Sequence, residues 1–250
     1  MPEVEYRLMA QVESSLWWYK VLHQHVCRAL SDLSIPLDAY ILDLGCGTGG
    51  LLQALKKAHY SNAIGQDINE TALTICREQG LNVSYGDIGA LSSTSSGLAD
   101  VIVSNDVIIA FAPAFHHTII KEMSRILKSG GILIMNLPAR QVFRGSHDVA
   151  VGIVERISSQ EFRKLLELNG FSVRSSFAWP FLLAPMILLT RSFQRLLLKI
   201  EPSRLVNSDV KPIPRFLNSV FEFITKLENN IPYSLRQFAS SQFFVCKKLN

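Results

Sequence analysis

The chain has 250 residues, of which 48% are hydrophobic and 18% charged, and its formal net charge is +4. This length and apolar content are typical of one large α/β domain and exclude a disordered or collagen-like chain. Four widely spaced cysteines without a Cys-x-x-Cys pair, and the lack of a strongly basic block, predict no disulfide framework, no metal site and no nucleic-acid binding.

The N-terminal segment is predicted to be a helical arm and not a signal peptide. Residues 1–15 contain three glutamates and no basic region followed by an apolar one, so we expect a cytoplasmic protein. Tyr6–Leu30 has helical periodicity and contains three consecutive aromatic residues, Trp17, Trp18 and Tyr19. These rings either close over a bound cofactor or hold the arm against the core, and the sequence leaves both interpretations open.

From residue 40 onward, apolar runs alternate with helix-length segments, which is the pattern of β-α units around a mostly parallel sheet. The predicted strands are Tyr40–Leu44, Ala63–Asp67, Asn82–Tyr85, Asp100–Ser104, Ile132–Leu137 and Phe171–Phe177. The predicted helices are Gly50–Ala58, Glu70–Gln79, Phe115–Leu127 and Ser158–Leu168. A turn at Lys128–Gly131 is expected to separate a helix from the strand after it.

Beyond residue 178 the pattern changes. Residues 179–238 contain six of the ten prolines and two amphipathic stretches, Leu182–Ile200 and Phe216–Asn229, before a last strand at Gln242–Lys247. The most apolar run, Phe177–Thr190, is shorter than the roughly 20 residues that cross a bilayer and is interrupted by two prolines, so we expect no transmembrane span. We interpret residues 179–238 as a helical cap over one end of the sheet.

These elements predict a Rossmann-like α/β fold, with a seven-stranded, mostly parallel sheet and helices on both faces. We expect residues 1–250 to form a single domain. Its parts are an N-terminal helical arm (1–35), a cofactor-binding core (36–178), the apolar cap (179–238) and the last strand (239–250).

A glycine-rich turn, Gly45-Cys46-Gly47-Thr48-Gly49-Gly50, follows the first predicted strand. Glycines at such a turn let the backbone bend tightly and approach a ligand without a Cβ in the way. Taken alone the motif is weak, because Gly45, Gly47 and Gly50 also satisfy the dinucleotide pattern Gly-x-Gly-x-x-Gly and because a tight turn need not bind anything.

Acidic residues near this turn favour one ligand class. Asp67 follows Gly45 by 22 residues at the end of the second predicted strand, where a carboxylate can accept the ribose hydroxyls of a nucleoside. Asp87 ends the next strand, and Asp43 lies within the first. These carboxylates would repel a pyrophosphate and attract the ammonium and sulfonium groups of S-adenosylmethionine. The sequence therefore favours S-adenosylmethionine over a nicotinamide dinucleotide.

On these residues the chain resembles the class I S-adenosylmethionine-dependent methyltransferases, particularly the small-molecule type. The resemblance covers residues 40–137, and its most specific element is Leu42–Gly49. A closer resemblance, to a bacterial subgroup of the methyltransferase type 11/12 kind, rests on Glu13-x-x-Leu16-Trp17-Trp18-Tyr19, on the Ser146–Gly152 segment and on the apolar cap.

The resemblance implies a set of cofactor-binding residues. Gly45 and Gly47 would border the methionine part, Asp67 would hold the ribose, Asp87 and Ile88 would lie at the adenine, and Asn105 would line the site. The full expected set is Asp43, Gly45, Cys46, Gly47, Asp67, Ile68, Asp87, Ile88, Asn105, Trp18 and Tyr19.

Two departures from the family pattern bear on catalysis. Ile109 and Ala110 stand where the family usually has a Glu-His pair, and Leu22 and His23 stand where the subgroup typically has paired arginines. His147, after the fifth strand, is our candidate for a substitute general base. Alternatively, it hydrogen-bonds Asp148 or the backbone and fixes its own loop.

The expected acceptor is a hydrophobic small molecule, such as a specialised metabolite or a quinone-like compound, methylated on nitrogen or oxygen in preference to carbon. We expect Trp17, Phe143, Phe181 and Met186 to line its pocket. The alternatives are a nicotinamide-dependent oxidoreductase and a catalytically silent cofactor-binding partner. For the cap, the sequence leaves a substrate lid, a peripheral membrane contact and a dimer interface open.

Overall fold

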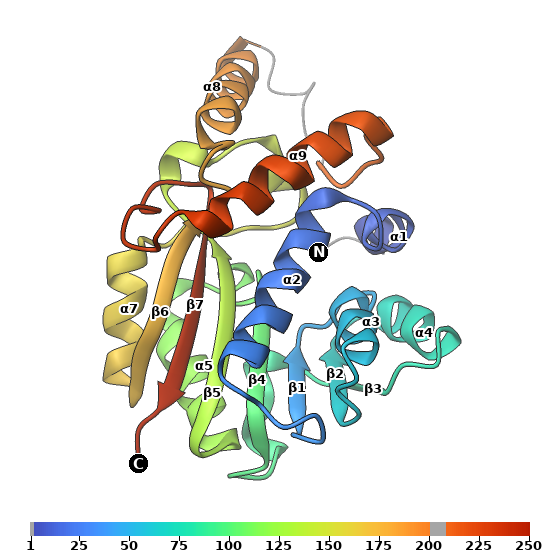
Figure 1. Ribbon diagram of the computed structural model, residues 1–250, viewed down its shortest axis with the longest axis vertical. Helices are drawn as coiled ribbons and strands as arrows, with labels where there is room; N and C mark the ends of the chain where they lie inside the picture. The colour runs from blue at the N-terminus through green and yellow to red at the C-terminus, as the bar shows by residue number, and fades with distance from the viewer. Residues whose placement is uncertain (1–2, 201–208) are drawn as a thin grey trace.

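The computed structural model describes residues 3–200 and 209–250. Its centre is a seven-stranded sheet in the order β3-β2-β1-β4-β5-β7-β6, and all strands run parallel except β7 (Figure 1). The strands are β1 Ile41–Leu44, β2 Ala63–Asp67, β3 Val83–Tyr85, β4 Ala99–Asn105, β5 Leu127–Pro138, β6 Phe171–Trp179 and β7 Ser241–Lys248. The fold class predicted from the sequence is confirmed.

Helices cover both faces of the sheet. The α-helices are α1 Glu3–Val12, α2 Trp17–Asp32, α3 Gly50–Lys57, α4 Glu70–Glu78, α5 Pro113–Ile126, α6 Ser146–Ala150, α7 Ser159–Leu168, α8 Ala184–Ile200 and α9 Arg215–Leu227. Short 3₁₀ turns are η1 Ile88–Ser93, η2 Ile108–Ala110, η3 Gln141–Phe143 and η4 Glu228–Asn230.

The core is divided between the two faces because successive side chains of a strand point to opposite sides. Val101 and Val103 of β4 pack with residues of α2 and α3, whereas Ile102 between them packs with residues of α5 and α7. The central strands are buried on both sides, as parallel strands covered by helices must be.

Two local features differ from the sequence-based expectation. The arm is two helices, α1 and α2, and not one helix from Tyr6 to Leu30. Strand β5 begins at Leu127, which pairs with Ala99, so the turn predicted at Lys128–Gly131 is wrong: all four residues belong to the strand, next to a register shift. Gly130 accommodates this irregularity with φ +72°.

The strand order fixes the cap at the carboxyl edge of the sheet. Strand β6 ends at the same edge of the sheet as β1, β2, β4 and β5, and antiparallel β7 begins there, since Trp179 and Pro138 both pair with Ser241. The chain between β6 and β7 must therefore leave and re-enter the sheet at its carboxyl edge, where α8 and α9 lie (Figure 1). Residues 1–2 of the expected arm and 201–208 of the expected cap lie outside the described residues.

Side-chain contacts join the cap to the arm. The rings of Trp17 and Phe221 lie 5.8 Å apart, Lys20 Nζ lies 2.6 Å from Glu222 Oε2, and Asn218 accepts a hydrogen bond from the Trp17 amide at 2.7 Å. Helix α9 therefore rests on the start of α2. No helix among the described residues has the length and apolar content needed to cross a bilayer.

Candidate functional site

The glycine turn leaves β1 at the carboxyl edge of the sheet. Gly45 has φ +79°, and a Cβ there would come within 2.2 Å of Val107 Cγ2, so only glycine fits without displacing Val107. The amides of Gly45 and Cys46 both donate to the Gln66 carbonyl, at 2.7 and 3.0 Å. These bonds tie the turn to the end of β2.

Asp67 braces this turn from the end of β2. Its carboxylate accepts hydrogen bonds from the amides of Gly47 and Asn69, both at 2.9 Å. Its backbone carbonyl accepts from the Gly86 amide at 3.1 Å, which brings the segment after β3 alongside. In that segment Asp87 caps η1 by accepting from the Gly89 amide at 2.7 Å.

The two expected isoleucines of the cofactor-binding set differ in exposure. Ile68 is 54% exposed, whereas Ile88 is 8% exposed and packs in the core. Ile68 is therefore the more accessible of the two to an incoming ligand.

Helix α1 lies over the turn. Tyr6 Oη donates to Asp67 Oδ1 at 3.4 Å, a Cβ on Gly47 would come within 2.6 Å of Met9 Cε, and Glu13 just beyond α1 accepts a hydrogen bond from the Thr48 hydroxyl. Sequence reasoning did not assign Tyr6 or Met9 to the site. Their contact with the turn depends on how the two helices of the arm fold back, which no local motif encodes.

Buried carboxyl groups collect at this turn. Burial raises the pKa of Glu13 to about 7 and holds that of Asp43 well above its usual range, with the neighbouring carboxylates acting in the same direction on Asp43. Among the described residues, no lysine or arginine lies within ion-pair distance of Glu13, Asp43 or Asp67. The turn is thus surrounded by carboxylates that lack a cation.

His23 does not supply that cation. Its Nε2 lies 3.9 Å from Glu13 Oε1, but burial lowers the pKa of His23 to about 4, so the ring is neutral near pH 7. Leu22, the other departure from the subgroup pattern, is buried in the core.

Asp106 follows β4 and extends the acidic group toward the centre of the sheet. It has φ +58°, and both of its carboxylate oxygens accept from Asn136 Nδ2 at 3.0 Å. The Trp179 indole donates to Asn136 Oδ1 at 2.7 Å, and because an indole N–H can only donate, it fixes which end of the Asn136 amide faces Asp106. Burial raises the pKa of Asp106 to about 7, although Asn136 and Arg156 act in the opposite direction.

Asn105 ends β4 beside Asp106, and its side-chain oxygen Oδ1 is buried without a hydrogen-bond partner. A buried acceptor without a donor is unfavourable, so this atom suits a ligand that brings an N–H or O–H group.

The two aromatic residues of the expected cofactor set have different neighbours. Trp18 stacks on Trp179 with ring centroids 5.4 Å apart. The pKa of Tyr19 is raised by burial and by the nearby charges of Glu13 and Asp106, so this phenol borders the acidic group.

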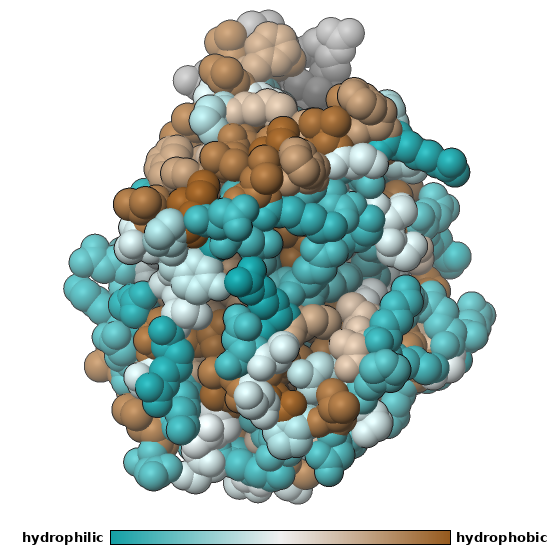
Figure 2. Space-filling view, viewed as in Figure 1, coloured by the Kyte–Doolittle hydropathy of each residue, from teal (hydrophilic) through white to brown (hydrophobic). Residues whose placement is uncertain are grey.

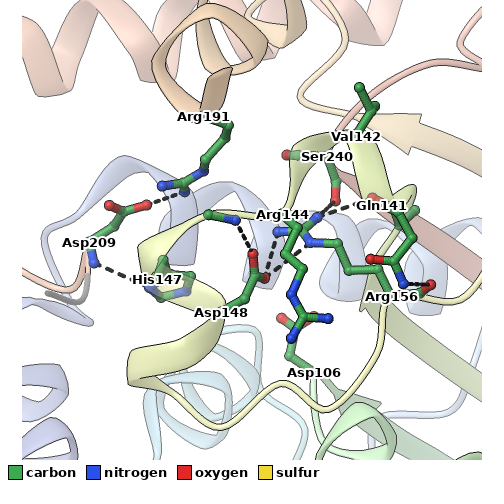
Figure 3. Close-up of polar contacts among 12 residues, drawn as sticks. Asp106, Gln141, Val142, Arg144, His147, Asp148, Arg156, Arg191, Asp209 and Ser240 are labelled. Atoms are coloured by element: carbon green, nitrogen blue, oxygen red, sulfur yellow. Dashed lines mark hydrogen bonds and ion pairs between the residues drawn. The ribbon is translucent and has the colours of Figure 1, made fainter. Parts of the chain in front are cut away.

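His147, the base expected from the sequence, lies in α6 in a polar network that includes Asp148 and Asp209, and Asp106 lies close by (Figure 3). Its Nδ1 accepts from the Asp209 amide at 3.2 Å, and burial lowers its pKa. Asp148 beside it is fully buried and ion-pairs with Arg156 at 2.8 Å. His147 thus holds the backbone of Asp209 in the cap, and its role as a base stays a prediction. Asp106 lies between the two groups, since its charge acts on Arg156 and, together with that of Glu13, on Tyr19.

The expected pocket residues have different neighbours. Phe143 has no exposed surface and packs against Phe238 with centroids 5.2 Å apart, Trp17 packs against Phe221, and Phe181 is half-buried. Met186 is 43% exposed on α8. Phe143 is therefore a core residue in this conformation and does not line an open pocket. Ile109, at the position of the missing Glu-His pair, is buried in the core.

Comparison with known proteins points to the same region. Residues 41–131 match a family described as a methyltransferase domain. The ribosomal protein L11 methyltransferase of Thermotoga maritima is 30% identical over 134 residues, which cover 53% of this chain and 44% of that protein. The ubiquinone biosynthesis O-methyltransferase of Methylococcus capsulatus is 32% identical over 133 residues, covering 44% of this chain and 54% of that protein. The chain thus spans about half the length of these curated relatives.

Among solved structures, a SAM-dependent methyltransferase from Archaeoglobus fulgidus has the same fold, with a TM-score of 0.57 and 18% identity over 90% of this chain and 94% of that one. The family match includes the glycine turn, Asp67, Asp87 and Asp106. Sequence similarity and the buried carboxylates therefore coincide at one edge of the sheet.

The raised pKa of Glu13 predicts a pH-dependent stability. Its value of about 7 lies above the ordinary glutamate value of 4.5, so its favourable contribution is complete below pH 4.5 and is lost as pH rises through 7. Between pH 5 and 8 the wild type should lose about 2–3 kcal/mol of unfolding free energy relative to Glu13→Gln. Urea unfolding of both proteins at the two pH values measures this, and an unchanged difference would contradict it.

The Asp148–Arg156 pair predicts a large loss of stability when one partner is removed. Asp148→Ala leaves the Arg156 charge buried and unpaired, and we expect a loss of about 3–5 kcal/mol in urea unfolding. Asp100→Ala is the matched control, because its pair with Lys128 is partly exposed and should contribute less than about 1 kcal/mol. Equal losses in the two variants would refute this account of α6.

Proposed function

We propose that the protein transfers the methyl group of S-adenosylmethionine to a nitrogen or oxygen atom of a hydrophobic small molecule. The proposal is supported by the match of residues 41–131 to a methyltransferase domain and by the fold. The same match supports the family and the cofactor expected from the sequence. We further propose that the arm, core, cap and last strand act as one domain.

The observation that carries this proposal is the buried group of carboxylates at the glycine turn. Unpaired buried carboxylates are unfavourable until a cation is added. S-adenosylmethionine has an ammonium and a sulfonium group, whereas the pyrophosphate of a nicotinamide dinucleotide would add further negative charge. The acidic turn therefore supports the sulfonium cofactor over the nicotinamide alternative.

The residues at the turn fit this cofactor. Asp43 and Asp67 would hold its positive and hydroxyl groups, and the unpartnered Asn105 Oδ1 would accept from its ammonium. Asp87, in the segment held beside the Asp67 backbone, would lie toward the adenine ring of the cofactor. Tyr6 already donates to Asp67, so an incoming hydroxyl group competes with Tyr6 for the same oxygen.

Bound S-adenosylmethionine supplies an electrophilic methyl carbon on a positively charged sulfur. The remaining work of the protein is to orient the acceptor and, for a hydroxyl or protonated amine, to remove a proton. We assign the removal of this proton to the carboxylate of Asp106. Its pKa of about 7 suits a general base near neutral pH, and Asn136 and Trp179 hold the carboxylate in place.

A hydrophobic acceptor suits the surroundings of this base. Ile109 and Ala110 stand shortly after Asp106 in place of the Glu-His pair of the family pattern, and Ile109 is buried in the core. The aromatic side chains of the arm lie across the same edge of the sheet. The relatives named above are, by their names, a methyltransferase of ribosomal protein L11 and an O-methyltransferase of ubiquinone biosynthesis. These names share no single acceptor, so the support for a hydrophobic acceptor comes from this chain's own residues.

Calorimetric titration tests cofactor binding. We expect the wild type to bind S-adenosylmethionine, and Asp67→Asn to bind it at least tenfold more weakly because the ribose loses an ionised acceptor. Glu70→Gln, an exposed carboxylate at the start of α4, is the control and should bind as the wild type does. Wild-type protein that binds a nicotinamide dinucleotide and not S-adenosylmethionine would overturn the proposal.

Transfer of a labelled methyl group to a panel of phenols, amines and indoles tests the reaction itself. Asp106→Asn should lower kcat about 10²–10⁴-fold on a phenol substrate, remove the limb of the pH profile near pH 7, and leave cofactor affinity within a few-fold. Asp100→Asn, on the same strand but at its opposite end, should leave kcat unchanged. A bound cofactor without transfer to any acceptor would favour a catalytically silent protein.

A further inference from the structure

Large apolar side chains gather on the outside of the cap. Of the twenty-four exposed large hydrophobic residues in the described chain, twelve lie between residues 182 and 238. We call the exposed apolar residues of α8 and α9 the cap face: Met186, Leu189, Phe193, Leu196, Phe216, Leu217, Phe223 and Leu227. Figure 2 shows hydrophobic side chains concentrated over α9 and the segment that leads from it to β7. Scattered apolar residues are normal on a surface, but a continuous group marks a binding surface.

The most exposed members of the cap face are bulky. Leu189 is 72% exposed and Phe193 61% exposed on α8, and Phe216 is 77% exposed and Phe223 62% exposed on α9. Both helices are amphipathic, because their other sides pack inward. Ala184 of α8 lies in a small core cluster with Phe143, and Phe221 of α9 packs on Trp17.

Acidic and basic residues of the cap differ in whether they have partners within the protein. Its described acidic residues are engaged with the protein: Asp209 pairs with Arg191, Glu222 pairs with Lys20 and Lys226, and the fully buried Glu228 accepts from the Leu182 amide at 2.9 Å. In contrast, Lys211 and Arg215 are exposed just before and at the start of α9 and form no ion pair among the described residues.

We propose that the cap face docks on an anionic lipid surface, with α8 and α9 lying in the interface and Lys211 and Arg215 at the level of the headgroups. Amphipathic helices with aromatic and leucine side chains on one side and basic residues beside them bind membranes in this way. A second copy of the chain is a poorer occupant, because the described acidic residues of the cap are already engaged and leave no carboxylate on this face to pair with Lys211 and Arg215 of the other copy.

Docking in this way would orient the whole molecule. Helix α9 rests on α2, whose Tyr19 borders the acidic group, so the lipid surface would lie on the side of the carboxyl edge of the sheet. An acceptor with a lipid-like tail would then reach the site from the membrane. This consequence for the acceptor rests on the proposed function, whereas docking itself does not.

Co-sedimentation with vesicles tests the docking. Wild-type protein should pellet with vesicles of equal parts phosphatidylcholine and phosphatidylglycerol, and weakly with phosphatidylcholine alone. The double variant Phe193→Glu/Phe216→Glu should bind the mixed vesicles at least tenfold more weakly. Lys211→Glu/Arg215→Glu should lose most of the preference for the anionic lipid. The matched control is Phe115→Glu/Leu168→Glu, which changes two exposed apolar residues on α5 and α7 and should bind as the wild type does.

Circular dichroism and titration with S-adenosylmethionine separate a docking defect from misfolding, since each variant should keep its fold and its cofactor affinity. Because no step depends on methyl transfer, a failure of the proposed reaction leaves this result unaffected. Wild-type protein that stays in the supernatant with both vesicle types overturns the proposal. So does equal loss of binding in the control variant. Sedimentation velocity showing a dimer that Phe193→Glu/Phe216→Glu dissociates, without vesicle binding, assigns the face to a second copy.

Discussion

Buried negative charge without a matching cation is the constraint on which the site depends. Parallel strands β1, β2 and β4 end at one edge of the sheet. Each has an acidic residue at or next to its last residue: Asp43, Asp67 and Asp106. Glu13 of the arm joins them through the Thr48 hydroxyl. Each buried carboxylate gives up hydration worth several kcal/mol, about the scale of the net stability of a domain. Raised pKa values of Glu13 and Asp106 show how the free protein reduces this penalty, namely by holding protons.

Much of the sheet and half of the site could be predicted from local sequence. The strands are short apolar runs between helices of regular period, and the glycine turn with Asp67 has a fixed place in such a fold. Asp106 could not be singled out, because its raised pKa comes from burial and its orientation from Asn136, which is 30 residues away in the sequence. Met9 and Tyr6 reach the turn only because the arm folds back as two helices. Phe143 was expected in a pocket, but its apolar ring is equally suited to the core that it occupies.

The cap and the site share one edge for a topological reason. Strand β6 delivers the chain to the carboxyl edge, and β7 must start from it, so any segment inserted between them stands beside the ligand-binding end of the sheet. An insertion elsewhere in the chain would not have this property. Because β7 runs antiparallel to its neighbours, the chain between β6 and β7 stays at this edge, where α9 contacts α2. The cap face and the acidic turn are therefore connected through the aromatic residues of the arm.

The position of β7 also constrains how the protein is made. This strand comes last in the chain yet lies between β5 and β6, where its residues 241–248 pair on both sides. During synthesis, β5 and β6 therefore have unpaired hydrogen-bonding edges until residues 241–248 have emerged from the ribosome. A nascent chain that stops before residue 241 exposes two strand edges side by side. Translation through residue 248 is thus a condition for closing the sheet, and products that stop earlier are open to aggregation through those edges.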